Sequence, residues 1–206
     1  VYKRQYFISP GEPNKLRLLS RQNTFNVSSV NRIVCIMGYT CSGTCLMSSL
    51  MDNHPNVLTF PDNVLSNFQD FWEKHGDLPL NPLLDKFLDK YTTIFDARTI
   101  PEGKEGTQET GESRGFTTLG KDRKECLEVD RNEFQRNMIK SIGEIYPVPR
   151  KLFFQAMHVE YNRALGREVS DPIIVFGLHS LTHPNRLKGL MEEFSDITFL
   201  NMVRHP

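Results

Sequence analysis

The segment from Gly38 to Thr44 has the residue types and spacing of a loop that binds phosphate. Its glycines, Gly38 and Gly43, are separated by four residues, and Ser42 and Thr44 add hydroxyl groups beside the second glycine. Glycine lets the backbone turn tightly, so that successive N–H groups and the first turn of a following helix point at one anion. The pattern therefore predicts binding of a phosphate-like group.

The loop lacks the lysine of a nucleotide-hydrolysing P-loop. That motif reads G-x-x-x-x-G-K-[ST], and its lysine reaches the outer phosphates of the nucleotide. Here Thr44 follows the second glycine, and no lysine occurs between Gly38 and Asn53. We therefore disfavour ordinary nucleotide hydrolysis and phosphoryl transfer, although the glycine spacing keeps a divergent nucleotide kinase as an alternative.

The elements that must position this loop are a buried strand before it and a helix after it. Apolar runs at 33–37, 173–176 and 197–203 predict strands, and helical periodicity predicts helices near 44–52, 64–72, 83–91, 130–144, 152–164 and 186–194. Strands separated by helices imply a central parallel sheet flanked by helices, an α/β fold. The segment 97–125 has few large apolar residues and is interpreted as a mobile loop.

Composition sets the broad class. The 206 residues suit one α/β domain, which we expect over 32–206 after an irregular lead-in over 1–31. Lysine plus arginine and aspartate plus glutamate are 25 each, so no global charge favours nucleic acid or an anionic membrane. No run approaches the ~20 apolar residues of a membrane span, and we expect a soluble domain.

The cysteines do not read as a disulfide framework. Cys35, Cys41 and Cys45 crowd around one apolar run, and Cys126 stands apart. Neither thioredoxin nor zinc-ligand spacing is present, so no metal is predicted. The helix start beside Cys41 would favour a thiolate, but that charge would repel the anion, and we prefer a neutral thiol to a redox role.

The string GYTCSGTCLMSSLMDNHPNV resembles the 5′-phosphosulfate loop of sulfotransferases, which reads G-x-x-[KR]-S-G-T-[ST] before a helix and a His-Pro pair. Ser42, Gly43 and Thr44 match, and the helix leucines and His54-Pro55 continue the likeness. A second segment, FLNMVRHP, is similar to the strand that ends in Arg-Asp-Pro in that family, and it places Arg204 at the arginine.

The resemblance implies a P-loop-like, three-layer α/β domain that binds 3′-phosphoadenosine 5′-phosphosulfate (PAPS). The 5′-phosphosulfate would be held by the loop, namely Gly38, Tyr39, Thr40, Cys41, Ser42, Gly43, Thr44 and Cys45, and the 3′-phosphate by Arg204. The family usually supplies further cofactor-binding segments beyond this arginine. Because the chain begins at Val1 and stops at Pro206, directly after a strand-like run, we expect a domain truncated at its C-terminus.

Two residues of the loop depart from the family pattern. Cys41 replaces the lysine or arginine that neutralises the leaving phosphate, and the loss of one such donor typically costs ~10²–10³ in rate. Cys45 replaces a hydroxyl that would donate a hydrogen bond. A catalytically impaired, sulfotransferase-like binding module is therefore a second alternative.

Sulfuryl transfer also needs a base for the acceptor's proton. His179 is the candidate, because it follows a predicted strand at the sheet edge where open α/β folds bind ligands; a polar strand cap is an equal alternative. His183 is a weaker candidate, and His54, beside Pro55, is interpreted as structural. The acceptor stays open among carbohydrate, protein tyrosine and small alcohols, and the compartment between cytoplasm and Golgi lumen.

Overall fold

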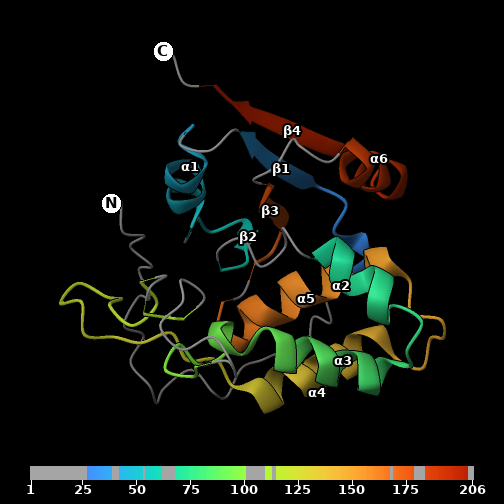
Figure 1. Cartoon of the computed structure of the whole chain (residues 1–206), viewed down its shortest axis with the longest axis horizontal. Helices are drawn as coiled ribbons and strands as arrows, with labels where there is room; N and C mark the ends of the chain where they lie inside the picture. Colours follow the sequence, from blue (N-terminus) through green and yellow to red (C-terminus); the bar gives the residue numbers. More distant parts are fainter. Residues whose placement is uncertain are drawn as a thin grey trace.

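Four parallel strands form a single sheet, which lies in the upper part of the view in Figure 1. The computed structural model describes residues 27–38, 42–52, 54–61, 68–100, 110–112, 115–167, 169–178 and 184–203. The strands are β1 (Ile33–Gly38), β2 (Val57–Thr59), β3 (Ile173–Leu178) and β4 (Ile197–Met202), in the order β2-β3-β1-β4. Every pair is parallel, which confirms the expected α/β fold with a parallel sheet.

Helices occupy about half of the described chain outside the strands. They are α1 (Thr44–Met51), α2 (Phe68–His75), α3 (Leu80–Lys90), α4 (Arg131–Ile142), α5 (Arg150–Ala164) and α6 (Pro184–Glu193), with short 3₁₀ turns η1 (Val27–Ser29) and η3 (Thr92–Ile94). The predicted helix start at Asp130 is confirmed, because its side chain accepts hydrogen bonds from the backbone N–H groups of Asn132 and Glu133, both at 2.9 Å. Helix α2 is described from Phe68 onward, and the first residues of the helix predicted near 64–72 lie outside the described residues.

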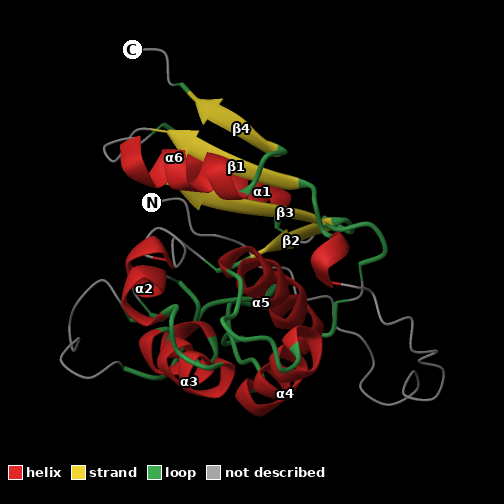
Figure 2. Cartoon of the chain, turned by 90° about the vertical axis from the view of Figure 1, so that its right-hand side faces the viewer, coloured by secondary structure: helices red, strands yellow, loops and turns green. Residues whose placement is uncertain are grey.

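Alternate residues of the strands point to opposite faces of the sheet. Cys35 of β1 and Phe176 of β3 belong to the large core that α2 to α5 and Phe194 complete. Ile36 and Val175, one position away, belong to a smaller core with Met47 of α1. Helix α1 therefore covers one face, and α5 covers the other; Figure 2 shows α2, α3, α4 and α5 gathered below the sheet.

Helix α5 is the centre of the large core. Every residue from Phe153 to Asn162 is buried, and aromatic rings surround the helix, with Tyr161 lying 4.4 Å from Phe60 between ring centroids. Its buried polar side chains bind distant backbone: Gln155 Nε2 donates to Val30 O at 2.7 Å and Asn162 Nδ2 to Thr59 O at 3.0 Å. The helix thus ties the chain before β1 to the end of β2.

Two segments pack more closely than the sequence predicts. In the lead-in, Val27 and Val30 are buried in the large core. In the segment interpreted as a mobile loop, Phe116 and Leu119 are fully buried, and Leu119 forms an antiparallel bridge with Glu125. The interpretation as a mobile loop is therefore wrong for 115–125, because two buried apolar side chains suffice to anchor this turn-rich stretch.

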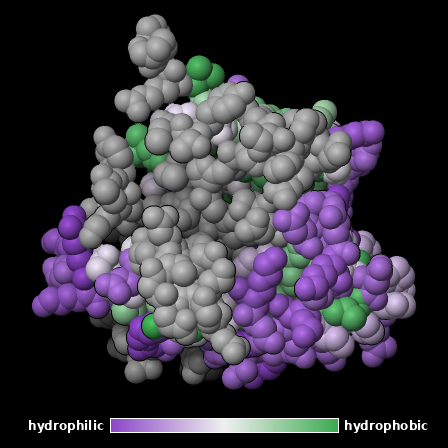
Figure 3. Space-filling model, in the orientation of Figure 1, coloured by the Kyte–Doolittle hydropathy of each residue, from purple (hydrophilic) through white to green (hydrophobic). Residues whose placement is uncertain are grey.

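The outer surface over α3 is strongly polar. In Figure 3 the lower right-hand part of the visible face, where Figure 1 places α2 and α3, is coloured mostly hydrophilic. The exposed residues of α3 include Asp85, Lys86, Asp89 and Lys90, while Leu84 and Phe87 face the core. Among the described residues, no helix combines the length and apolarity needed to cross a bilayer.

Candidate phosphate-binding site

The end of β1 is shaped for the loop that follows it. An ideal Cβ built on Gly38 would lie 2.2 Å from Ser42 Oγ and 2.8 Å from Thr44 Cγ2, distances at which no real Cβ is found. Ser42 and Thr44 therefore lie so close to the strand end that a side chain at position 38 would have to displace them. The close approach of Ser42 to Gly38 is compatible with the tight turn that the glycine spacing predicts, while residues 39–41 lie outside the described residues.

The second glycine starts the helix. Gly43 has φ 95° and ψ 9°, a left-handed conformation that favours glycine, and it stands at the N-cap of α1 without a side-chain capping bond. The first helical hydrogen bond runs from Met47 N to Gly43 O at 3.0 Å, so the amides of residues 44 to 46 have no acceptor within the helix. Amides in this position of a helix are the donors that a bound anion uses.

Ser42 supplies a further donor at the same place. Its hydroxyl oxygen is buried and has no hydrogen-bond partner among the described residues. A buried hydroxyl without a partner costs free energy unless a ligand or water satisfies it. Thr44, which is 5% exposed, lies on the same side of Gly38 as this hydroxyl. The loop therefore places an unsatisfied donor next to the open N-terminus of α1.

Three strand ends meet around this loop. Gly38, the last residue of β1, pairs with Met202 at the end of β4, and Met37 pairs with Leu178 at the end of β3. His179 directly follows Leu178, and Arg204 stands two residues after Met202. The sheet thus brings the ends of the strands that precede all three predicted binding segments to one edge.

This edge contains the topological switch point of the sheet. The connection from β1 passes through α1 to β2 on one side, whereas the connection from β3 passes through α6 to β4 on the other side of β1. Right-handed crossovers in opposite directions place their helices on opposite faces. The loops after β1 and β3 then diverge, and this is where open α/β sheets bind ligands.

Some of the predicted site residues lie within the described chain and some do not. Gly38, Ser42, Gly43 and Thr44 come together at the loop, as described above, while for Cys45 the backbone alone is described, in the first turn of α1. Outside the described residues lie Tyr39, Thr40, Cys41, His179, His183 and Arg204.

Arg167 binds the turn that connects the end of α1 to β2. Arg167 Nη2 donates to the backbone oxygens of His54 at 3.0 Å and Val57 at 3.1 Å. Burial lowers the pKa of this guanidinium, and Asp52 opposes that effect. His54 Nδ1 accepts from Asn56 N at 3.2 Å, a local bond that agrees with the structural role expected for this histidine. Arg167 thus anchors the α1–β2 connection to the end of α5.

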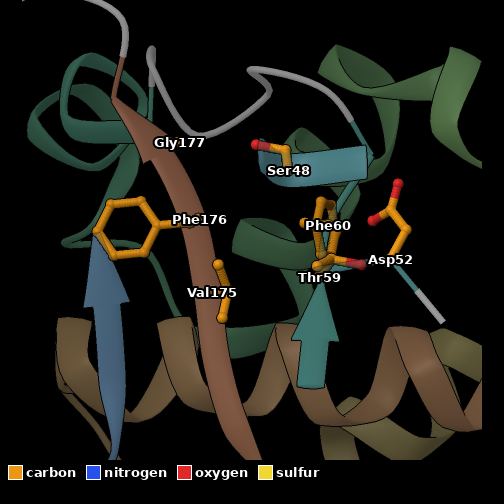
Figure 4. A pocket seen from close by; sticks show the side chains of 7 residues that line it. All are labelled: Ser48, Asp52, Thr59, Phe60, Val175, Phe176 and Gly177. Carbon is orange, nitrogen blue, oxygen red and sulfur yellow. The ribbon is translucent and has the colours of Figure 1, made fainter. Parts of the chain in front are cut away.

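A small pocket lies beside α1 at the tip of β2 (Figure 4). Ser48 and Asp52 of the α1 segment, Thr59 and Phe60 at the end of β2, and residues 175–177 of β3 line it. Its volume of about 20 Å³ is the space of one or two water molecules. The pocket is too small for a nucleotide or an acceptor sugar, so it does not compete with the loop as the binding site.

The described cysteine of the strand before the loop is buried. Burial raises the pKa of the Cys35 thiol in β1 to about 12, which makes this cysteine unreactive. Among the described residues, no group of three or more His, Cys, Asp or Glu side chains is arranged to hold a metal ion. Since neither lysine nor arginine occurs from 38 to 53, backbone amides and hydroxyls are the donors that the loop itself offers.

Met202 lies beside the loop, and the sequence pattern did not indicate this. Met202 packs against both glycines: ideal Cβ atoms on Gly38 and Gly43 would lie 3.2 Å and 3.9 Å from it. An apolar residue in a predicted strand carries no chemical signature. The parallel pairing of β1 with β4, which the order of elements along the chain does not specify, was needed to find it.

Comparison with known proteins gives no further assignment: neither a protein-family model, nor a curated protein, nor a solved structure matches this chain.

Proposed function

We propose that this chain is a P-loop-like, sulfotransferase-type domain that binds PAPS and transfers its sulfuryl group to an acceptor hydroxyl or amine. The observation that carries the proposal is the pairing of Gly38 with Met202, because it sets the strand end before the phosphate-type loop beside the strand end before Arg204. In the sequence these two segments are more than 150 residues apart. A binding site for a nucleotide with two separated anionic groups needs both at one edge.

The loop would hold the 5′-phosphosulfate. The unpartnered Ser42 hydroxyl and the amides at the start of α1 are suited to several anionic oxygens at once. Arg204 is assigned to the 3′-phosphate, since a guanidinium binds phosphate through two parallel hydrogen bonds. The helix dipole of α1 adds a favourable field at the same point.

The reaction would proceed by in-line displacement at sulfur. The acceptor oxygen or nitrogen forms a bond to sulfur while the bond from sulfur to the bridging phosphate oxygen breaks, and adenosine 3′,5′-bisphosphate leaves with the electron pair of that bond. His179, which directly follows β3, is assigned to take the acceptor's proton. The loop's part is to position the donor and to stabilise charge on its departing oxygens.

Cys41 limits what the loop can do in catalysis. A neutral thiol provides no fixed positive charge at the position where the family has lysine or arginine, so we expect slow turnover by the chain as it stands. If the chain is a binding module, Cys41→Lys should raise sulfuryl transfer by at least 10-fold while affinity for the bisphosphate changes less. The assay uses ³⁵S-labelled PAPS with a desulfated glycosaminoglycan, a tyrosine peptide and a phenol as acceptors.

Calorimetric titration with adenosine 3′,5′-bisphosphate tests the binding proposal. We expect saturable one-to-one binding that competes with PAPS and needs no Mg²⁺, and we expect Ser42→Ala to weaken it. ATP with Mg²⁺ is the matched comparison. Magnesium-dependent ATP turnover without bisphosphate binding would favour a divergent nucleotide kinase and overturn the proposal.

A further inference from the structure

Met202 is the residue through which β4 touches the phosphate-type loop. Its Cβ lies 3.2 Å from the position of an ideal Cβ on Gly38, and its terminal methyl carbon, Cε, lies 3.9 Å from that on Gly43. One side chain therefore reaches from the first residue of the loop to the residue that starts α1. The side chain therefore lies beside both glycines, in addition to the backbone pairing of β1 with β4.

The surroundings of Met202 explain why a long, unbranched side chain suits this place. It packs in the smaller core, together with Ile36 of β1, Met47 of α1 and Leu200 of β4. Glycines have no side chain of their own to fill the space beside them, and a void left there would lose contacts on both sides. Methionine is flexible enough to follow an irregular gap such as the one beside this turn.

We propose that Met202 is a positioning residue, which holds Gly38 and Gly43 at the separation that turns the loop amides toward one anion. The nature of that anion rests on the proposed function, but the packing effect on the loop does not. Through Met202, the geometry of the loop would depend on the position of β4. Strand β4 also leads to Arg204.

The test compares Met202→Ala with two matched variants. Leu200→Ala removes an apolar side chain from the same strand, the same face and the same core, without a close approach to either glycine. Met202→Leu keeps a side chain of similar volume at position 202 but makes it shorter. Three readouts are needed: the dissociation constant for adenosine 3′,5′-bisphosphate, the hydrogen-exchange rate of the backbone over 38–47, and the midpoint of urea unfolding.

We expect Met202→Ala to weaken binding about 10-fold and to accelerate amide exchange over 38–47 several-fold. Leu200→Ala should lower the unfolding midpoint by a similar amount with less than a 2-fold change in binding, and Met202→Leu should restore most of the affinity. Equal effects of the two alanine variants on binding and on loop exchange would overturn the inference. If Met202→Ala does not fold, Met202→Val provides the same comparison.

The two proposals fail separately. Absence of bisphosphate binding by the unmodified chain would refute the proposed function, and loop exchange alone would then decide the inference about Met202. Binding that is unaffected by Met202→Ala, with unchanged loop exchange, would leave the proposed function standing and refute the inference.

Discussion

The hydroxyl of Ser42 occupies the space that a side chain at position 38 would need, since Ser42 Oγ and an ideal Cβ on Gly38 would be 2.2 Å apart. We therefore predict that Gly38→Ala displaces the loop, lowers the free energy of unfolding by about 1–3 kcal/mol and weakens bisphosphate binding at least 10-fold. Urea unfolding and calorimetry measure the two effects. Wild-type affinity in this variant would show that the turn does not shape the site.

Gly189 in α6 is the control for that substitution. A Cβ there would meet nothing closer than Arg150 Nη2 at 3.8 Å, an ordinary contact, and the residue lies within a helix. Gly189→Ala should stabilise the chain by about 0.5–1 kcal/mol and leave bisphosphate affinity unchanged. A loss of stability would mean that α6 does not tolerate the added methyl group.

Gly43→Ala tests the left-handed turn at the start of α1. Because φ at this position is 95°, an alanine is strained whatever space surrounds it, and we expect a loss of about 1–2 kcal/mol in the free energy of unfolding. The loop amides should also lose their alignment, so bisphosphate binding should weaken. An alanine variant with unchanged stability would indicate that the conformation at 43 is not the one described.

The Arg150–Glu193 ion pair joins α5 to α6, and Arg150 also binds Gln69 of α2 and Gly189 O. Burial raises the pKa of Glu193, and Arg150 opposes that effect. Arg150→Ala would leave this carboxylate without its cation, and we expect a loss of about 2–3 kcal/mol in the free energy of unfolding. The exposed pair of Arg98 with Asp96 provides the comparison, because solvent screens it and Arg98→Ala should change the free energy of unfolding much less.

His158 should make stability depend on pH. It is fully buried, its Nδ1 donates to Phe154 O at 2.8 Å, and burial lowers its pKa to about 4. An exposed histidine titrates near 6.5, so the unfolded chain takes up the proton first as the pH falls. The contribution of neutral His158 to the free energy of unfolding is fully present above pH 6.5. It is lost between about pH 6.5 and 4, and the loss amounts to at most about 3 kcal/mol.

Urea unfolding at pH 7.5 and 5.5 checks this prediction, with His158→Phe as the comparison. The aromatic replacement keeps much of the ring packing against Phe60 and Phe154 and removes the titrating group. The wild type should lose more stability than the variant between the two pH values. Identical losses would assign the pH dependence to other groups.

The sequence predicted long apolar strands and capped helices better than short strands. Runs such as Ile33 to Met37 are continuous because parallel strands are buried on both faces, and Asp130 is a strong helix-start signal. Strand β2 was missed because its three residues, Val57 to Thr59, follow a His-Pro turn and are too short for a periodic pattern. Its existence depends on pairing with β3, which is a long-range contact.

Buried polar residues of α5 show a second limit of sequence reasoning. A helix with Gln155, His158, Glu160 and Asn162 reads as amphipathic, yet all four side chains are buried. Gln155 and Asn162 are satisfied by backbone oxygens more than 100 residues away, and Glu160 accepts from Ser141 Oγ at 2.5 Å and from Arg163 Nη1 at 2.7 Å. Such partners are defined by the tertiary fold, so periodicity alone does not reveal them.

Amide hydrogen exchange with and without adenosine 3′,5′-bisphosphate tests the central claim most directly. If the backbone amides of the loop and of the first turn of α1 bind the anion, the ligand should slow amide exchange of residues 42–46 by at least 10-fold. The exchange rates of α3 and α4 should not change. Saturating bisphosphate that protects no amide between 42 and 46 would contradict the account.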